Sequence, residues 1–566
     1  MIYSEKIVET KMCGECNQRF DVTDKDLEFY DDISPIINGK QYSIDGSSSC
    51  PKCREQRRLS WRNERKLYRR KCDITGKDII SMFSSDKKNK VYQYNEWGKD
   101  FWNPLNYGFE YNADKGFFEQ YKVLLDSVPM KSLFIGLSEN CDYNNLLTHC
   151  KDCYMCFDSQ KLENTLFSEY SINVNDSMEV TWSDDIKKSY EILDSVNIYS
   201  SSFCNSSSNL VNCHFCYSCE NCTDCFMCSG VNNKKYHILN KEYSEKEYKE
   251  KVNDVKGRGD YIEFCKNTFN NFNLTIPKKN FKASGNENSV GNNIFNSKDL
   301  YKCFNVVSAN NFRYVDGGGR SKDVLDGNII YDGEGKIYNS LSVIGSFSVY
   351  NSLYVYNSSD IFYSFYLFGC KNCFGCVGLT NKSYCLFNKQ YSKQEYFDLL
   401  SRIIKKMQSS LEWGDFFPKD FSLFGYNETI ANEFYPLDKE MAIIKGYNWC
   451  DYESPFPKVE KIIPAGKLPN DIKDIPDDIL NWAIKCDVTE KPFRIIKAEL
   501  DFYRKYNLPI PKKHPDQRHL DRLNLRGGKK TFDRKCDKCN KQIQSIYSND
   551  KKEIVYCEEC FNKEFY

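Results

Sequence analysis

The sequence predicts a mainly β protein in which a duplicated stack of short strands is flanked at each end by a tandem pair of small β-ribbons. Two internal repeats support this prediction. Residues 71–102 recur without a gap at 535–566, and residues 222–248 recur in the same way at 370–396. The long tracts upstream of each copy of the second repeat alternate small polar residues with Tyr, Phe, Val and Leu, which is the periodicity of strands.

One ribbon of each terminal pair carries two Cys-x-x-Cys motifs. This spacing is typical of a closed site in which four thiolates surround one zinc ion. We therefore expect two zinc ions per chain, and the expected ligands are Cys13, Cys16, Cys50, Cys53, Cys536, Cys539, Cys557 and Cys560.

The other ribbon of each pair keeps the surrounding sequence but has lost most of its thiols. The positions that align with the two complete sites hold Cys72, Thr75, Gln93 and Glu96 in one ribbon, and Cys486, Thr489, His514 and Gln517 in the other. A third ion at Cys486 and His514 would need ligands from elsewhere in the chain. A ribbon that persists without its ligands is kept for its surface rather than for metal chemistry.

The centre of the chain, residues 131–241 and 285–389, is predicted to form two halves of a β-solenoid. Asn and Ser return at the corners between short apolar runs, where they form tight turns. Stacked coils of this kind bury a continuous core only when neighbours cover one another. A Greek-key β-sandwich is the alternative.

Three groups of cysteines within this centre are spaced by three residues: 150–156, 213–228 and 370–376. A flat strand places every second residue on one face, so this spacing requires a path with frequent corners. Three interpretations remain open. The thiols line the solenoid core, they form further zinc knuckles, or they hold an iron–sulfur cluster, although the usual fourth cysteine followed by proline is absent.

Helices are predicted only between these parts. Phe117, Phe118, Tyr121, Leu124 and Leu125 form an apolar stripe, and the capping boxes that start at Ser244 and Ser392 each begin a helix. The expected organisation is a ribbon pair at 1–102, a helical connector at 103–130, solenoid halves at 131–241 and 285–389, a helical linker at 242–284, a helix at 390–412, an extended strap rich in aromatic residues and proline at 413–475, and a ribbon pair at 476–566 with a short helix over 479–484.

Composition narrows the class of protein. The formal net charge is zero and 28 residues are cysteine. No apolar run is long enough for a signal peptide or a membrane span. We therefore expect a cytoplasmic protein with no membrane partner. In a reducing compartment the cysteines are expected to be metal ligands or buried thiols rather than disulfides.

Two basic stretches, 54–71 and 512–535, lie between the ribbons of each pair. A basic helix flanked by ribbons suits contact with a phosphate backbone, so we expect RNA or a ribonucleoprotein, or else a protein, as the partner. A solvated helix face is the alternative. The candidate contacts are Arg57, Arg58, Arg62, Arg65, Arg69, Arg70, Arg518, Arg522, Arg526, Lys529 and Lys530.

Several phrases, among them CPKCREQRRLSWRNERKLYRRKCD, CFGCVGLTNKSYCLFNKQYSKQEY, WGDFFP and FGYNETIANE, resemble an uncharacterised family of zinc-ribbon proteins from candidate-phylum bacteria and giant viruses. If the source is a giant virus, as the resemblance allows, the expected location is the host cytoplasm or the virion. Some members carry a CaiB/BaiF-like label, after a class of CoA-transferases. The resemblance implies four ribbons that each bind metal, from which this chain departs at Thr75, Gln93, Glu96, Thr489 and Gln517. Nothing in the sequence has the alternating strands and long helices of a CoA-transferase.

Three functions follow from these features. The first is a non-catalytic structural or interaction protein built on a solenoid with ribbon clamps. The second is a carbohydrate-active enzyme on a β-helix, for which Asp316, Asp323 and Asp326 beside the glycine-rich turn 317–319 are the available carboxylates. The third is a metal or redox protein that uses the spaced cysteines. No catalytic residue is predicted, and the first function is preferred.

Overall fold

The computed structural model describes residues 5–330, 335 and 337–565. Strands hold 31% of the residues and helices 25%, so the protein is mainly β as predicted. The chain forms two compact units. Unit 1 contains residues 1–132 and 281–452, and unit 2 contains residues 133–280 and 453–566. Each unit therefore joins one ribbon pair to the strand stack that is remote from it in sequence.

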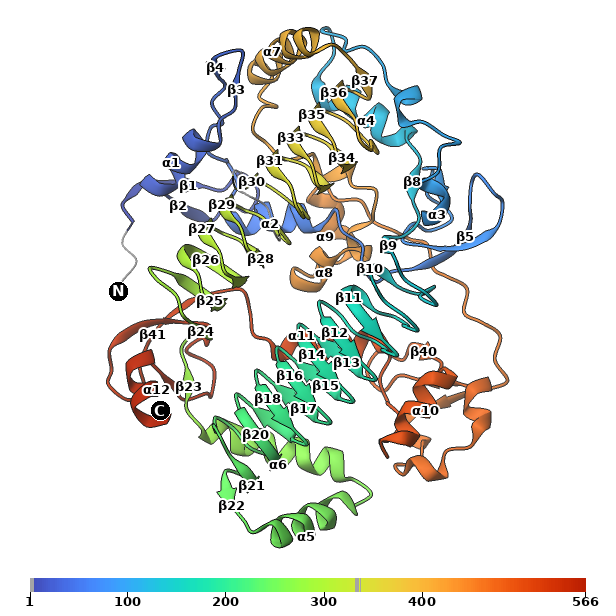
Figure 1. Ribbon diagram of the computed structural model, residues 1–566, viewed down its shortest axis with the longest axis vertical. Helices are drawn as coiled ribbons and strands as arrows, with labels where there is room; N and C mark the ends of the chain where they lie inside the picture. The colour runs from blue at the N-terminus through green and yellow to red at the C-terminus, as the bar shows by residue number, and fades with distance from the viewer. Residues whose placement is uncertain (1–4, 331–334, 336, 566) are drawn as a thin grey trace. The chain divides into compact units, whose positions relative to one another are not determined.

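Each unit contains a stack of short, mostly parallel strands (Figure 1). Stack 1 in unit 2 consists of β9 (Ile135–Gly136), β10 (Asn145–Thr148), β11 (Phe157–Glu163), β12 (Ile172–Asn175), β13 (Met178–Thr181), β14 (Asp184–Lys187), β15 (Tyr190–Leu193), β16 (Val196–Tyr199), β17 (Ser202–Asn205), β18 (Ser208–Val211), β19 (His214–Tyr217), β20 (Glu220–Phe226), β21 (Lys235–Ile238) and β22 (Lys241–Glu242). Stack 2 in unit 1 consists of β24 (Ala283–Ser284), β25 (Val290–Phe295), β26 (Lys298–Val307), β27 (Asn310–Arg313), β28 (Asp316–Gly319), β29 (Lys322–Leu325), β30 (Ile337–Tyr338), β31 (Phe347–Tyr350), β32 (Leu353–Tyr356), β33 (Ser359–Phe362), β34 (Phe365–Phe368), β35 (Lys371–Phe374), β36 (Ser383–Leu386) and β37 (Lys389–Gln390).

The register of stack 1 advances by twelve residues at each step, so that Val174 pairs with Ile186 and Ile186 with Ile198. Along most of the stack every third residue has a positive φ, for example Asn173, Asp176 and Glu179. Many of these residues are Asn, Asp or Ser, of which Asn and Asp tolerate the left-handed region best. The chain therefore turns every three residues, and the residue after each turn faces inward.

This path explains the cysteines spaced by three. The sulfurs of Cys213, Cys216, Cys219 and Cys222 all belong to the buried core of stack 1. Each also donates its S–H to a backbone carbonyl, as Cys213 does to Val211 O at 3.4 Å. Cys370, Cys373 and Cys376 lie in the core of stack 2 in the same way. The interpretation as core thiols is confirmed by this burial.

A serine ladder runs through the interior of stack 1. The backbone N–H of Ser183 donates to Ser171 Oγ at 3.3 Å, Ser195 N–H to Ser183 Oγ at 3.1 Å, and Ser207 N–H to Ser195 Oγ at 3.1 Å. A buried N–H without a partner is costly. The hydroxyls therefore satisfy donors at the turns, where no strand pairing is available.

Helices pack against the last strands of each stack. After stack 1 follow α5 (Glu245–Lys256) and α6 (Tyr261–Thr275), and after stack 2 follows α7 (Lys393–Ser409). The capping boxes predicted at Ser244 and Ser392 are both formed. The predicted apolar stripe becomes α4 (Phe117–Ser127). None of the helices in the described ranges combines the length and apolar composition that crossing a bilayer requires.

The ribbons contain short hairpins and helices. The first ribbon (residues 7–66) holds β1 (Ile7–Met12), β2 (Arg19–Thr23), α1 (Asp24–Ile33), β3 (Ile36–Ile37), β4 (Lys40–Gln41) and α2 (Pro51–Leu59); the second (68–102) holds β5 (Tyr68–Lys71), β6 (Asp78–Ser81), β7 (Val91–Tyr92) and α3 (Tyr94–Trp97). The third ribbon (462–526) holds β38 (Ile462–Pro464), β39 (Ala483–Lys485), β40 (Pro492–Phe493), α10 (Lys497–Lys505) and α11 (Pro515–Leu525); the fourth (532–565) holds β41 (Phe532–Lys535), β42 (Gln542–Ser545), β43 (Val555–Tyr556) and α12 (Glu558–Phe565).

Three local predictions were wrong. The helix expected over 479–484 is a 3-10 turn, Asp477–Asn481, followed by β39, because β39 pairs with β38 and β40. The glycine-rich segment 317–319 is part of strand β28 rather than a turn. The basic stretch 54–71 is helical only to Leu59, where α2 ends, and its last residues form β5.

Candidate metal centres and docking faces

All four ribbons contain the same turn at their first cysteine. In each, the fourth residue after that cysteine has a positive φ and donates its N–H to the cysteine carbonyl at 2.9 to 3.1 Å. The four cysteine–donor pairs are Cys13 and Asn17, Cys72 and Gly76, Cys486 and Glu490, and Cys536 and Asn540. The backbone turn is thus kept whether or not the other ligands are present.

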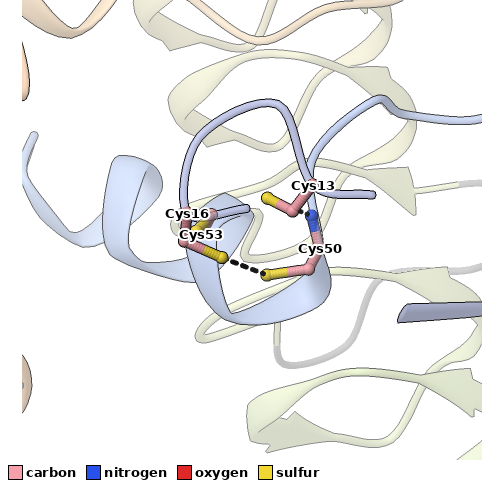
Figure 2. Close-up of side chains that lie close together, drawn as sticks. All are labelled: Cys13, Cys16, Cys50 and Cys53. Carbon is pink, nitrogen blue, oxygen red and sulfur yellow. Dashed lines mark hydrogen bonds between the residues drawn. The ribbon is translucent and has the colours of Figure 1, made fainter. Parts of the chain in front are cut away.

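Two groups of four cysteines lie close enough to hold a metal ion. Cys13, Cys16, Cys50 and Cys53 form the first group, and their sulfurs lie within 4.8 Å of one another. Figure 2 shows these four side chains turned toward a common centre; Cys53 lies on α2, and the other three lie in the loops of the first ribbon. Cys536, Cys539, Cys557 and Cys560 form the second group in the fourth ribbon.

The spacing of the sulfurs fits tetrahedral coordination of one metal ion. Cys16 Sγ and Cys50 Sγ are 3.8 Å apart, and so are Cys539 Sγ and Cys557 Sγ. Four thiolates at the zinc–sulfur bond length would stand about 3.8 Å from one another. Both predicted sets of four cysteines are therefore brought together as the sequence indicated.

Local hydrogen bonds favour a thiolate at one cysteine of each group, while the pKa values of Cys16, Cys53, Cys557 and Cys560 are raised. A hydrogen bond with the Cys53 thiol lowers the pKa of Cys50 to about 5, against the effect of burial. Burial opposes ionisation of Cys536, but backbone N–H groups of Cys557 and Cys539 outweigh it and lower its pKa to about 6. Metal ligation requires the deprotonated sulfur.

The ribbons that have lost thiols keep part of this hydrogen bonding. Gln93 N–H donates to Cys72 Sγ at 3.4 Å, just as Cys557 N–H donates to Cys536 Sγ at 3.2 Å at the aligned position. Outside the two complete groups, the described residues contain no further cluster of three or more potential metal-ligating side chains.

The second and fourth ribbons each bind the strand that leads into a stack. Val91 in β7 pairs with Met130 in β8 (Met130–Lys131), and Val555 in β43 pairs with Lys278 in β23 (Lys278–Lys279). The flanking hydrogen bonds also match: Ser132 N donates to Tyr92 O at 2.8 Å in unit 1, and Asn280 N to Tyr556 O at 3.0 Å in unit 2.

The first ribbon docks on stack 2 through three arginines spaced by four residues. Arg54 binds both carboxylate oxygens of Asp326, with Nη2 at 2.8 Å from Oδ1. Arg58 Nε donates to Asn328 Oδ1 at 3.1 Å, and Arg62 Nη1 donates to Ser342 Oγ at 2.8 Å. The side chains of Arg58 and Asp326 are 1% and 0% exposed.

The third ribbon docks on stack 1 in the same way. Counting on from the aligned Cys50 and His514, the three arginines correspond to Arg518, Arg522 and Arg526. Arg518 and Arg522 share the buried carboxylate of Glu179, and Arg526 Nε donates to Asp194 Oδ1 at 2.9 Å. Arg526 also lies 4.2 Å from the ring centre of Trp182. Each unit therefore contains one carboxylate that binds two arginines.

Most of the candidate nucleic-acid contacts are engaged in this docking or otherwise buried. Of these candidates, all of which lie in the described part of the chain, only Arg69 and Lys530 are exposed, and Arg526 and Lys529 are half-buried. The buried candidates are Arg57, Arg58, Arg62, Arg65, Arg70, Arg518 and Arg522. In the folded units these seven side chains present almost no surface to a phosphate.

The carboxylates considered for carbohydrate chemistry have structural partners. Asp326 binds Arg54, while Asp316 and Asp323 accept hydrogen bonds from Asn305 and Asn311 at 2.7 and 2.8 Å. The role of Asp326 was missed because an arginine so distant in sequence gives no local signal. Its only sequence signature is the matched arginine spacing of the two basic stretches.

No family model matches this chain, and a search of curated proteins finds none that is similar to it.

Proposed function

We propose that the chain is a non-catalytic, zinc-binding scaffold protein. In this proposal the two stacks are β-solenoid platforms, and each platform is held by a ribbon whose arginines dock on it. The observation that carries the proposal is the link between metal ligand and docking residue. Arg54 directly follows Cys53 on α2 and binds the buried Asp326 of stack 2.

The metal in this proposal is structural. Four cysteine ligands complete a tetrahedral shell and leave no position for water or substrate, which is the difference between structural and catalytic zinc sites. The energy of metal binding then contributes to folding of the ribbon. In the first ribbon, metal binding would stabilise the position of α2, the helix that carries Arg54 and Arg58.

The partner proposed for the scaffold is a protein. Contact with RNA or a ribonucleoprotein has less support, because seven of the basic residues that suggested it are buried, and four of these, Arg58, Arg62, Arg518 and Arg522, bind residues of the stacks. The enzyme alternatives are left out, because Asp326 is paired and the spaced cysteines form the core of the stacks.

Metal analysis of the full chain, purified without oxygen, tests this proposal. We expect two zinc ions per chain, no iron and no acid-labile sulfide. Cys53→Ser and Cys536→Ser should each lower the zinc content to one ion, and Cys216→Ser, the matched change within the stack core, should leave it at two. Stoichiometric iron, or loss of metal from the Cys216 variant, would overturn the scaffold function in favour of a redox protein.

A further inference from the structure

Unit 2 contains an open pocket between stack 1 and helix α12 of the fourth ribbon. Its volume is about 90 Å³. The side chains that give the pocket its polar and aromatic surfaces are Ser206, Ser218, Glu220, Asn232, Phe561 and Phe565. The pocket is thus walled by small polar groups on the stack and by two aromatic rings on the ribbon.

The equivalent place in unit 1 has the same framework but is lined by aromatic side chains. Gly230 borders the pocket and aligns with Gly378, and both have a positive φ, 68° and 73°. An aromatic ring of the ribbon covers each glycine: Phe565 lies 3.8 Å from the position of a Cβ on Gly230, and Trp97 lies 3.4 Å from that on Gly378. The two places are therefore built on the same framework.

The difference lies in the side chains of the stacks. At the spacing of the repeat, Ser206, Ser218 and Glu220 of unit 2 correspond to Tyr354, Tyr366 and Phe368 of unit 1. Tyr366 is 1% exposed, and the ring of Phe368 packs 6.3 Å from Trp97, centre to centre. Aromatic side chains therefore stand in unit 1 at the positions where unit 2 has serine and glutamate.

The open pocket presents acceptors without partners. The half-buried Glu220 carboxylate has no ion-pair partner within the described ranges, and the Oδ1 atom of Asn232 is buried without a hydrogen-bond donor. Phe561 and Phe565 stack on each other with ring centres 4.6 Å apart. A carboxylate, an amide oxygen and an aromatic wall are complementary to a cation that has several N–H donors.

We propose that this pocket binds a guanidinium group such as that of an arginine side chain. The chain already shows this recognition on the same stack, where Arg526 combines an ion pair to Asp194 with contact to the ring of Trp182. A planar guanidinium can stack on a ring and bind a carboxylate with two N–H groups at once, which an ammonium cannot. The proposal extends the scaffold function by giving stack 1 a ligand class that stack 2 lacks.

Binding of N-ethylguanidinium to the full chain, measured by NMR titration, tests the proposal. Glu220→Gln should weaken binding at least fivefold, and Ser218→Tyr, which introduces the residue found in unit 1, should abolish it. Glu163→Gln, a matched change on an exposed strand residue of the same stack, should have no effect. The proposal is overturned if Glu220→Gln binds as the natural chain does, or if neutral N-ethylurea or ethylammonium binds equally well.

Two further ligands identify the source of the group. A capped tripeptide with a central arginine represents a partner protein, and free L-arginine represents a small molecule. Tighter binding of either one supports the guanidinium site and names its source, whereas binding of neither overturns it. A redox-active metal content would remove the scaffold function but would leave the result of these titrations unchanged, so the two proposals fail separately.

Discussion

At the scale of single residues, each unit depends on one buried carboxylate that binds two arginines. Asp326 is fully buried and lies between Arg54 and Arg58, and Glu179 is placed likewise between Arg518 and Arg522. Burial alone would raise the pKa of Glu179, but the nearby positive charges, chiefly Arg518 and Arg522, together outweigh it and lower that pKa. Charges so deeply buried are stable only while every partner is present.

Replacing Arg54 should therefore destabilise unit 1 strongly. Arg54→Met leaves Asp326 without its bidentate partner, and we expect a loss of about 3 to 5 kcal/mol in the free energy of unfolding. Urea unfolding followed by tryptophan fluorescence measures this loss. Arg69→Met, at an exposed arginine, should change stability by less than about 0.5 kcal/mol. The double variant Arg54→Met with Asp326→Leu should recover most of the loss; no recovery would contradict the pairing.

Lys278 should make the stability of unit 2 change with pH in the alkaline range. Burial lowers its pKa from 10.5 to about 8, and its ammonium lies 3.4 Å from Ser229 Oγ and 4.4 Å from the ring centre of Tyr217. Below pH 8 Lys278 is charged in both the folded and the unfolded state, so the folded state bears the full free-energy cost of burying that charge. Between about pH 8 and 10.5 the folded state loses the proton first, and stability should rise by roughly 3 kcal/mol.

The aligned residue in unit 1, Met130, supplies the variant that tests this effect. Lys278→Met should stabilise unit 2 at pH 7 and remove the rise in stability between pH 8 and 10.5. Thermal unfolding across this range measures both. An unchanged pH dependence in the variant would show that another group causes it.

At the scale of elements, the sequence predicted the features that are local. The Cys-x-x-Cys pairs, the two capping boxes and the stripe that becomes α4 depend on residues a few positions apart, and all were found from spacing. The cysteines spaced by three indicated a path with frequent corners, which the positive φ at every third residue of stack 1 provides. Periodicity could not show which residues lie opposite one another after each turn.

The docking of the ribbons could not be predicted in the same way. Arg54 and Asp326 are 272 positions apart, and a basic stretch has the same composition whether it faces a phosphate or a buried carboxylate of its own chain. The net charge of zero was one indication that the basic stretches pair within the chain, because acidic residues elsewhere must balance them. The matched spacing of the arginines in both ribbons is the second hint.

The serine ladder should matter to the stability of stack 1 beyond its packing. Ser183→Ala removes the acceptor for the buried N–H of Ser195 at 3.1 Å. Leaving one buried donor unsatisfied costs about 1 to 3 kcal/mol. Thermal unfolding of this variant should show that loss, while Ser200→Ala, at a half-buried turn position whose hydroxyl has no such role, should change little. Equal stability of the two variants would exclude a role for the ladder.

At the scale of the whole molecule, each unit unites segments that are far apart in the chain. Unit 1 brings the first ribbon to stack 2, and unit 2 brings the third ribbon to stack 1. The metal site of the first ribbon should therefore support a stack some 270 residues away rather than the stack that follows it in sequence. Hydrogen exchange separates these two possibilities because it reports protection peptide by peptide.

The expected result is a loss of protection confined to unit 1. Cys53→Ser should remove the metal from the first ribbon, release Arg54 and Arg58, and speed amide exchange in β27 to β29, where Asp326 follows the last strand. Peptides from β12 to β15 of stack 1, which bind the third ribbon, should keep the protection of the natural chain. Cys536→Ser, the matched change in unit 2, should spare β27 to β29 and loosen β23 instead, because β43 of the fourth ribbon pairs with it. Faster exchange of stack 1 in the Cys53 variant would mean that the ribbon supports its neighbour in sequence, and would contradict the arrangement of the units.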